Sequence, residues 1–354
     1  MIQKKIKYRQ YFTFLILFVA YSIQAQIGTP SNPTYGNVQS TASSDYYSQL
    51  IGLSGTELRN ALKNIVVNST TKGQNYGDVW LMLREADENP ANTNQVWQIY
   101  IESGIDKSEQ NTGGSTGWNR EHIFPQTRGG FADGTSTSSD GKDVYFSTSS
   151  SQITHAHGDA HHLRASFVGE NSNRGNLDFG NVSGPRTKNS YFYEPPLSAK
   201  GDVARALFYM EIRYDALSLA AGDQDGQIIG DLTALLQWDK LDAPDDFEMR
   251  RNNVVYDWQN NRNPFIDNPN LVDYIWGDKQ GLAWPGSTSS GIKLTSIDAF
   301  PVVQYGTVSE SKTYLVEGTE LDETLNIDAP EHFEISLNDI DFVKHLESVS
   351  YTHL

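Results

Sequence analysis

The sequence contains no cysteine among its 354 residues. This absence excludes disulfide bonds, thiolate metal ligands and cysteine nucleophiles. The fold must therefore be stabilised without disulfide cross-links, chiefly by packing. A chain of this length is long enough to bury a sizeable apolar core.

Long apolar runs are also scarce. The one strong run, YFTFLILFVAYS at 11–22, follows four basic residues near the start of the chain. That order is typical of a secretory signal, and the sequence offers a cleavage site after Ala25. The run is shorter than the roughly 20 residues that span a bilayer. We therefore expect residues 1–25 to be a cleaved signal peptide, and the mature protein to be secreted without a membrane span.

Positive charge is the third deficit. The chain has 27 Lys and Arg against 44 Asp and Glu, a net charge of −17, and loss of the four basic residues of the leader lowers it to −21. Such a charge opposes non-specific attraction to nucleic acid over the whole surface. The deficit is uneven, because residues 113–190 hold seven basic and seven acidic residues, whereas 291–354 hold three and twelve. The neutral central stretch is compatible with a local phosphate-facing surface, which the charge balance alone neither proves nor excludes.

The pattern of apolar residues indicates a mainly helical domain. Residues 26–45 are rich in Gly, Pro, Ser and Thr and are expected to form a flexible lead-in. Apolar residues recur at helical spacing in four later segments, 54–68, 76–87, 200–217 and 231–244. Ser54 and Glu57 have the spacing of a capping box at the first of these. Alternation over 94–102 predicts a strand.

The composition changes after Pro285. Residues 287–291, STSSG, form a linker, and alternating apolar and polar residues over 292–354 predict short strands of an immunoglobulin-like β-sandwich. Only four or five such strands fit, so we expect the sandwich to be incomplete in this sequence. The resulting prediction is an α+β chain with a mostly helical domain at 46–286 and a partial β-sandwich after it.

The run WNREHIFPQTRGG at 118–130 contains the first candidate catalytic residues. Glu121 and His122 are adjacent, and adjacent side chains on a strand point to opposite faces. If they act together, the strand must bend or end there. An isolated Glu-His pair is more often a structural ion pair. This pair, however, follows a Gly-rich approach and precedes a long irregular segment that reaches Ser151, and long loops are uncommon unless functional.

A second polar run, THAHGDAHHLRASFVGENSNRGN, covers 154–176. The spacing of His161, Leu163 and Phe167 favours a short helix within it. Its histidines also suggest a zinc site of the kind found in metallo-β-lactamase-like hydrolases, which use HxHxDH. Here Ala160 separates Asp159 from the next histidine, so the spacing fails, and zinc ligand geometry is demanding.

Both runs together resemble the secreted and periplasmic bacterial endonuclease I family, whose members are His-Me finger (ββα-metal) nucleases. The resemblance extends from about Tyr47 to Trp284 and includes RALFYMEIRY (205–214) and QNNRNPFIDNP (259–269). It implies a ββα-metal core in the helical domain. The segment 292–354 lies outside it.

The resemblance implies a role for three residues. His122 aligns with the general base that takes a proton from the attacking water, a task that suits a neutral imidazole. Glu121 and Asn171 align with the protein ligands of one catalytic metal. A carboxylate and an amide oxygen favour Mg²⁺, with Mn²⁺ or Ca²⁺ as substitutes. Cleavage is then expected to leave 5′-phosphate and 3′-hydroxyl ends.

Several other residues are candidates for supporting roles. Asp159, His161 and His162 match a family run and are expected to orient the ligands, with a structural role equally open. Arg174 and Arg128 are candidates to grip phosphate, as is Arg262, for which an ion pair is equally open. Trp118 is expected to be a packing anchor. His155 and His157 are assigned to solvent.

Three functions follow from these observations. The first is a secreted, monomeric, metal-dependent endonuclease of low sequence specificity that acts on DNA and possibly RNA. The second is a zinc hydrolase that uses the cluster at 155–162, for which loss of His157 would abolish activity. The third is a non-enzymatic surface or adhesion protein whose working part is the sandwich.

Overall fold

The computed structural model describes residues 32–111 and 113–286 and, nearer the C-terminus, 291–294, 309, 311–312, 316–319, 326–329, 333–336 and 340–347. Contacts divide the chain into two compact units, Met1–Trp284 and Pro285–Leu354. The expected signal peptide and most of the expected linker lie outside the described residues. Among the residues described, no helix is long and apolar enough to cross a membrane.

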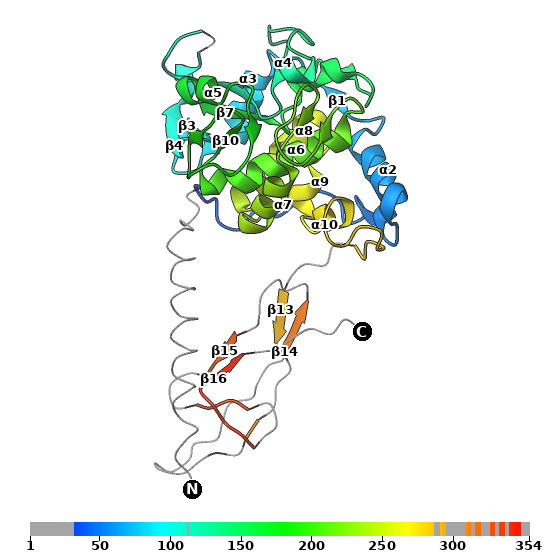
Figure 1. The fold of residues 1–354 in the computed structure, drawn as a ribbon, viewed down its shortest axis with the longest axis vertical. Coiled ribbons are helices and arrows are strands. Elements are labelled where there is room, and N and C mark those ends of the chain that lie inside the picture. Colours follow the sequence, from blue (N-terminus) through cyan, green and yellow to red (C-terminus); the bar gives the residue numbers. More distant parts are fainter. Residues whose placement is uncertain are drawn as a thin grey trace. The chain divides into compact units, whose positions relative to one another are not determined.

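The first unit mixes helices with short strands, as the α+β prediction requires (Figure 1). The α-helices are α2 (Gly55–Val66), α3 (Val79–Ala86), α4 (Gln126–Gly129), α5 (Val168–Arg174), α6 (Lys200–Arg213), α7 (Leu232–Leu241), α8 (Asp246–Gln259), α9 (Pro264–Asp267) and α10 (Leu271–Ile275). The 3₁₀ turns are η1 (Ser48–Leu50), η2 (Lys107–Glu109), η3 (Ile153–Gly158) and η4 (Leu197–Ala199). The strands are β1 (Lys72–Gly73), β2 (Glu88–Asn89), β3 (Asn92–Gln98), β4 (Ser103–Asp106), β5 (Trp118–His122), β6 (Phe146–Ser147), β7 (Leu163–Phe167), β8 (Asp178–Phe179), β9 (Thr187–Lys188), β10 (Phe192–Glu194), β11 (Ser218–Leu219) and β12 (Ile228–Ile229).

Helix α6 is the centre of the larger apolar core. All of its residues are buried except Lys200 and Glu211, which are half-buried. A helix that is buried all round belongs in a protein interior. It packs against α2, α7 and α9, and Figure 1 shows it in the middle of the unit. The helix ends at Arg213 because Tyr214 adopts extended backbone angles.

A second, smaller core supports the strand pair β5–β7. These strands are antiparallel, with Glu121 opposite Arg164 and His122 opposite Leu163. Their apolar side chains pack with those of α3 and α8, and the tryptophan of β5, Trp118, is fully buried there. The expected packing role of Trp118 is therefore confirmed. These contacts hold in place the strand pair, whose strand β5 carries Glu121 and His122.

Buried charged side chains connect the two cores. Asp87, at the end of α3, accepts a hydrogen bond from Arg251 of α8 at 2.8 Å and forms an ion pair with Arg164 of β7 at 3.3 Å. Arg164 also donates to Asp202 of α6 at 2.6 Å. Arg205, one turn further along α6, pairs with Glu248 and Asp239. Ion pairs of this kind fix the relative positions of α3, α6, α8 and β7.

Asp242 follows α7, and its carboxylate accepts a hydrogen bond from the Gly201 amide at 2.9 Å. Burial, followed by the charge of Asp202, raises the pKa of Asp242 from 3.8 to about 7. Between about pH 4 and pH 7 the folded chain therefore keeps a proton that the unfolded chain has released, so stability falls as the pH rises through this window. We expect Asp242→Asn to raise the Tm at pH 8 and to raise it by a smaller amount at pH 5, where the pH has crossed only part of this window. Calorimetry with the exposed Asp225→Asn as control tests this, and an equal gain at both pH values contradicts it.

Three local expectations need correction. Ser54 is the N-cap of α2, but its side chain makes no capping hydrogen bond, so the predicted capping box does not form. The expected strand at 94–102 is β3, which begins at Asn92 and ends at Gln98. The prediction of a short helix around Leu163 is wrong, because Leu163–Phe167 form strand β7. Pairing with β5 overrides the helical spacing there, since tertiary contacts routinely outweigh local preference.

In the second unit the described residues form two antiparallel pairs. β13 (Gly291–Leu294) pairs with β14 (Val316–Thr319), and β15 (Asn326–Asp328) pairs with β16 (His345–Glu347). Short strands were expected here. Whether they make an immunoglobulin-like sandwich stays a prediction, since many residues between them lie outside the described part.

Candidate active site

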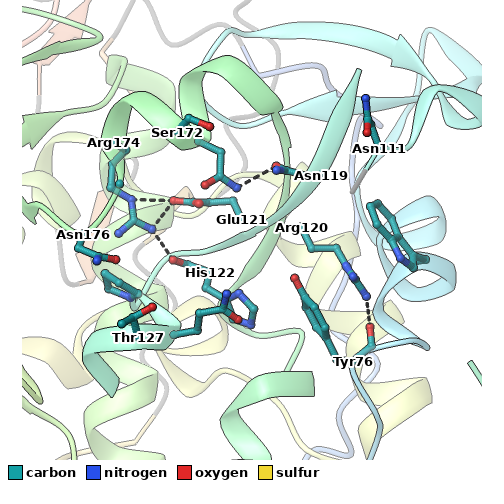
Figure 2. Close-up of a pocket in the computed structure, with 15 residues that line it drawn as sticks. Tyr76, Asn111, Asn119, Arg120, Glu121, His122, Thr127, Ser172, Arg174 and Asn176 are labelled. Carbon is teal, nitrogen blue, oxygen red and sulfur yellow. Dashed lines mark hydrogen bonds and ion pairs between the residues drawn. The ribbon is translucent and has the colours of Figure 1, made fainter. Parts of the chain in front are cut away.

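A cavity of about 380 Å³ opens at the end of β5 and brings together most of the candidate residues. Side chains of β5, α3, α4 and α5 line it, among them the predicted Glu121, His122, Asn171 and Arg174 (Figure 2). The strand ends at His122, and the cavity receives side chains from both faces of the strand. Glu121 and His122 thus reach one cavity although they are neighbours on a strand.

The backbone conformation just before β5 determines the position of the strand. Gly117 has a φ of +85°, a conformation that side chains rarely adopt, and a Cβ there would lie 2.2 Å from the carbonyl oxygen of Glu109. The Gly117 carbonyl accepts a hydrogen bond from the Val168 amide at 3.1 Å, at the start of α5. The Gly-rich approach therefore fixes β5 against the helix that carries Asn171.

Glu121 is buried and has three donors on one of its oxygens. Oε1 accepts from the Tyr100 hydroxyl at 2.7 Å, from Arg174 Nε at 2.8 Å and from Arg174 Nη2. Within the described residues Oε2 makes no hydrogen bond. Burial raises the pKa of Glu121, and the charge of Arg174 opposes that rise. Arg174 therefore holds the carboxylate in place and favours its ionised form.

Asn171 lies on α5 beside the strand. Its Nδ2 donates to Asn119 Oδ1 at 2.8 Å, which fixes the orientation of the amide and leaves Oδ1 without a hydrogen bond among the described residues. By strand alternation Asn119 is on the same face of β5 as Glu121. The amide oxygen of Asn171 and the second oxygen of Glu121 are thus two free oxygen donors in one cavity.

His122 is buried, and its ring is oriented by a backbone carbonyl. Nε2 lies 3.2 Å from the carbonyl oxygen of His157, so this nitrogen carries the hydrogen and donates it. The remaining nitrogen, Nδ1, then has a free lone pair. Burial, followed by the charge of a protonated His162, lowers the pKa of His122 well below its usual value. The ring is therefore a neutral imidazole near pH 7 and can accept a proton.

The assignment of His157 to solvent is wrong. His157 is 2% exposed, its ring stacks on Tyr76 at 4.1 Å between centroids, and its Nδ1 accepts from the Thr135 amide at 3.0 Å. Its carbonyl is the acceptor for His122. His155 is half-buried and its ring lies 4.7 Å from that of Phe146, outside the cavity that contains His122. Sequence patterns missed His157 because its partners come from distant segments.

The side chains of Asp159, His161 and His162, also in the second run, are buried in the protein. Asp159 accepts from the hydroxyls of Tyr209 at 2.8 Å and Tyr214 at 2.9 Å, and is buried. His161 Nε2 lies 3.0 Å from the carbonyl oxygen of Asn261, and His162 Nε2 lies 2.8 Å from that of Ala156. Burial lowers the pKa of both histidines to about 4. Asp159 therefore holds the turn at 153–162 against the end of α6, His161 holds it against the segment after α8, and His162 bonds within the turn itself.

These contacts remove the basis for a zinc site at 155–162. Within residues 32–111 and 113–286, no three His, Asp or Glu side chains are grouped so that they could hold a metal ion. Nε2 of His161 and of His162 faces a backbone carbonyl, and the carboxylate of Asp159 faces tyrosine hydroxyls. His157 Nδ1 accepts from the Thr135 amide, so these four residues make hydrogen bonds within the protein.

Two candidate phosphate-binding arginines are engaged elsewhere. Arg128 donates to Asp178 at 2.7 Å and to several backbone carbonyls, including those of Asn176 at 3.0 Å and Gln224 at 2.8 Å. Arg262 is buried and donates twice to Asp267, at 2.6 and 2.7 Å. Neither lines the cavity. The proposed contact of Arg128 with phosphate has no support in this geometry, and Arg262 forms the ion pair that was the open alternative.

The cavity also contains an arginine, Arg120, that the sequence motifs did not single out. Arg120 is 8% exposed and lies between the rings of Tyr76 and Trp80, with its guanidinium carbon 3.4 and 4.2 Å from their centroids. Burial lowers the pKa of Arg120 to about 10, so it remains a cation near neutral pH. Strand alternation was the available signal, because residues 120 and 122 share one face of a strand.

Comparison with known proteins agrees with this site. The family model of endonuclease I matches residues 54–270, which include both runs. An extracellular ribonuclease of Bacillus amyloliquefaciens is 38% identical over 279 residues, covering 73% of this chain and 89% of that protein. An extracellular ribonuclease of Bacillus subtilis (strain 168) is 36% identical over 247 residues, covering 65% of this chain and 78% of that protein. These matches favour an enzyme over an adhesion protein. The chain belongs to the endonuclease I family and is a nuclease, a hydrolase of phosphodiester bonds.

Proposed function

We propose that this chain is a secreted, monomeric, metal-dependent endonuclease of low sequence specificity that cleaves both RNA and DNA and leaves 5′-phosphate and 3′-hydroxyl ends. The observation that carries the proposal is the pairing of a neutral, oriented His122 with two free oxygen donors in one cavity. The names of the two relatives support RNA as a substrate and support secretion.

His122 is the general base. Its Nε2 donates to the His157 carbonyl, so Nδ1 accepts a proton from a water molecule. The oxygen of that water forms a bond to phosphorus, the bond from phosphorus to the 3′ oxygen breaks, and the 3′ oxygen takes a proton from solvent. The lowered pKa keeps the base form available at neutral and mildly acidic pH. No step uses the 2′-hydroxyl of RNA, and for this reason the proposal includes DNA.

Glu121 and Asn171 would hold the metal. Their free oxygens are hard donors, which suit Mg²⁺, with Mn²⁺ or Ca²⁺ as substitutes. When bound, such an ion offsets the negative charge that develops on the phosphate and on the leaving oxygen. Arg174 opposes the rise in the pKa of Glu121 that burial causes, and Asn119 orients the amide of Asn171. The ends of these ligand side chains are thus fixed by hydrogen bonds within the protein.

The ends of the products test this mechanism. A fluorescent RNA, its 2′-O-methyl analogue and the matching DNA are each incubated with the protein in Mg²⁺ or in EDTA. We expect cleavage of all three in Mg²⁺, loss of cleavage in EDTA, and 5′-phosphate with 3′-hydroxyl ends throughout. Cleavage of the unmodified RNA alone, with 2′,3′-cyclic phosphate ends, would show that the 2′-hydroxyl is the nucleophile and that His122 has a different role.

A further inference from the structure

Arg120 is a buried cation in the active-site cavity without a carboxylate partner. Among the described residues it forms no ion pair, and its Nη1 donates a hydrogen bond to the Tyr76 carbonyl. Its Nε is buried and makes no hydrogen bond. A buried charge is costly unless it is paired. Such an arrangement is expected where an anion binds from outside the protein.

Most other buried arginines of the unit are neutralised within the protein. Arg174 pairs with Glu121, Arg205 with Glu248 and Arg251 with Asp87; Arg164 and Arg262 pair with Asp202 and Asp267. Arg213 forms no ion pair either, but it does not line the cavity. Arg120 therefore differs from the others in combining an unpaired charge with a position in the active site.

The surroundings of Arg120 fix its orientation relative to the base. The guanidinium lies between Trp80 and Tyr76, and Tyr76 stacks in turn on His157. The Tyr76 ring is also 5.1 Å from that of His122, centroid to centroid. Figure 2 shows Arg120 and His122 projecting into the same pocket, with Tyr76 beside them. An arginine held by aromatic rings keeps the edge of its guanidinium available for hydrogen bonds.

We propose that Arg120 binds a phosphate group of the nucleic acid substrate at the bond that is cut, and that the aromatic rings of Tyr76 and Trp80 hold it ready for this contact. The inference rests on the proposed nuclease function and adds the residue that recognises the substrate backbone. A guanidinium can donate two parallel hydrogen bonds to phosphate, which a lysine cannot. Such a contact carries no sequence information, in keeping with low specificity.

The test compares Arg120→Lys and Arg120→Ala with Arg128→Lys, an arginine that pairs with Asp178 outside the cavity. Cleavage of a fluorescent oligonucleotide gives kcat and KM, and thermal unfolding checks the fold. We expect kcat/KM to fall about 10- to 100-fold in both Arg120 variants and to change little in Arg128→Lys. Guanidinium ion added to Arg120→Ala is expected to restore part of the activity.

Binding measurements give a second readout, which would stay unchanged if the role of Arg120 were purely structural. In a His122→Ala background, which keeps the oligonucleotide intact, the slope of log Kd against log salt is expected to be shallower by about 0.7 to 0.9 in the Arg120→Ala protein than in its parent, the loss of one phosphate contact.

The outcomes separate the two proposals. If the unmodified protein fails to cut any of the nucleic acids in Mg²⁺, the proposed function is wrong whatever Arg120 does. If it cuts, and folded Arg120 variants either cut equally well or lose activity with an unchanged salt slope and no rescue by guanidinium, the assignment of Arg120 is overturned.

Discussion

Replacing His122 with alanine is expected to lower kcat by about 10²- to 10⁴-fold, the usual contribution of a general base. The imidazole is buried and neutral, with one nitrogen directed at the His157 carbonyl and the other free. Alanine removes the proton acceptor without touching Glu121 or Asn171. The metal dependence of any residual activity is therefore expected to persist.

His155→Ala is the matched control. His155 is half-buried, contacts Phe146 and lies outside the cavity, so its loss is expected to change kcat less than a few-fold. His157→Ala, in contrast, is not a neutral control, because its ring supports Tyr76 and its backbone orients His122. Steady-state rates with RNA and DNA at saturating Mg²⁺ make the comparison. Equal kcat values for wild type and a folded His122→Ala protein would exclude His122 as the base.

Replacing Arg205 with methionine is expected to lower the free energy of unfolding by about 3–5 kcal/mol at neutral pH, the usual cost of removing one partner of a buried ion pair. Arg205 Nε donates to Glu248 at 3.0 Å, and Nη1 donates to Asp239 at 3.1 Å and to the Asp242 carbonyl at 2.7 Å. Methionine fills similar space but leaves two buried carboxylates unpaired. Those carboxylates tie α7 and α8 to α6.

The size of this effect is expected to depend on pH. Burial already raises the pKa of Asp239 to about 6 and that of Glu248 well above its usual value, and Arg205 opposes both shifts. Without Arg205 the carboxylates stay protonated to higher pH in the folded chain, so the loss of stability grows as the pH rises. Urea unfolding at pH 5 and pH 8 measures it. Lys63→Met, which breaks the exposed pair with Asp215, is the control and is expected to cost about 0–1 kcal/mol.

The end of the strand that carries Glu121 could be predicted from the sequence. Glu121 lies on a strand that ends at the next residue, as expected, and Asn171, the other proposed ligand, lies on a short helix beside it. The expectation for the strand rested on two adjacent residues. The family motif added the pairing of the two runs, which are about 50 residues apart.

The surroundings of the site depended on contacts that no local pattern reveals. Arg120 is held by Tyr76 and Trp80, which precede it by about 40 residues. The residues that flank Arg128 in the sequence are typical of a phosphate-binding site. In the structure, however, the Arg128 side chain donates its hydrogen bonds to Asp178 and to the turn at 224–228. Whether an arginine is free or paired is decided by the tertiary fold.

The turn that carries His157 depends on residues far along the chain. Asp159 is held by Tyr209 and Tyr214, and His161 by the carbonyl of Asn261. The segment 118–176 contains every proposed ligand and the base, yet it lacks these three partners. Transplanting that segment alone into another scaffold would thus carry the catalytic groups without the supports that aim them. A minimal nuclease cut from this chain has to retain α6 and the turn after α8.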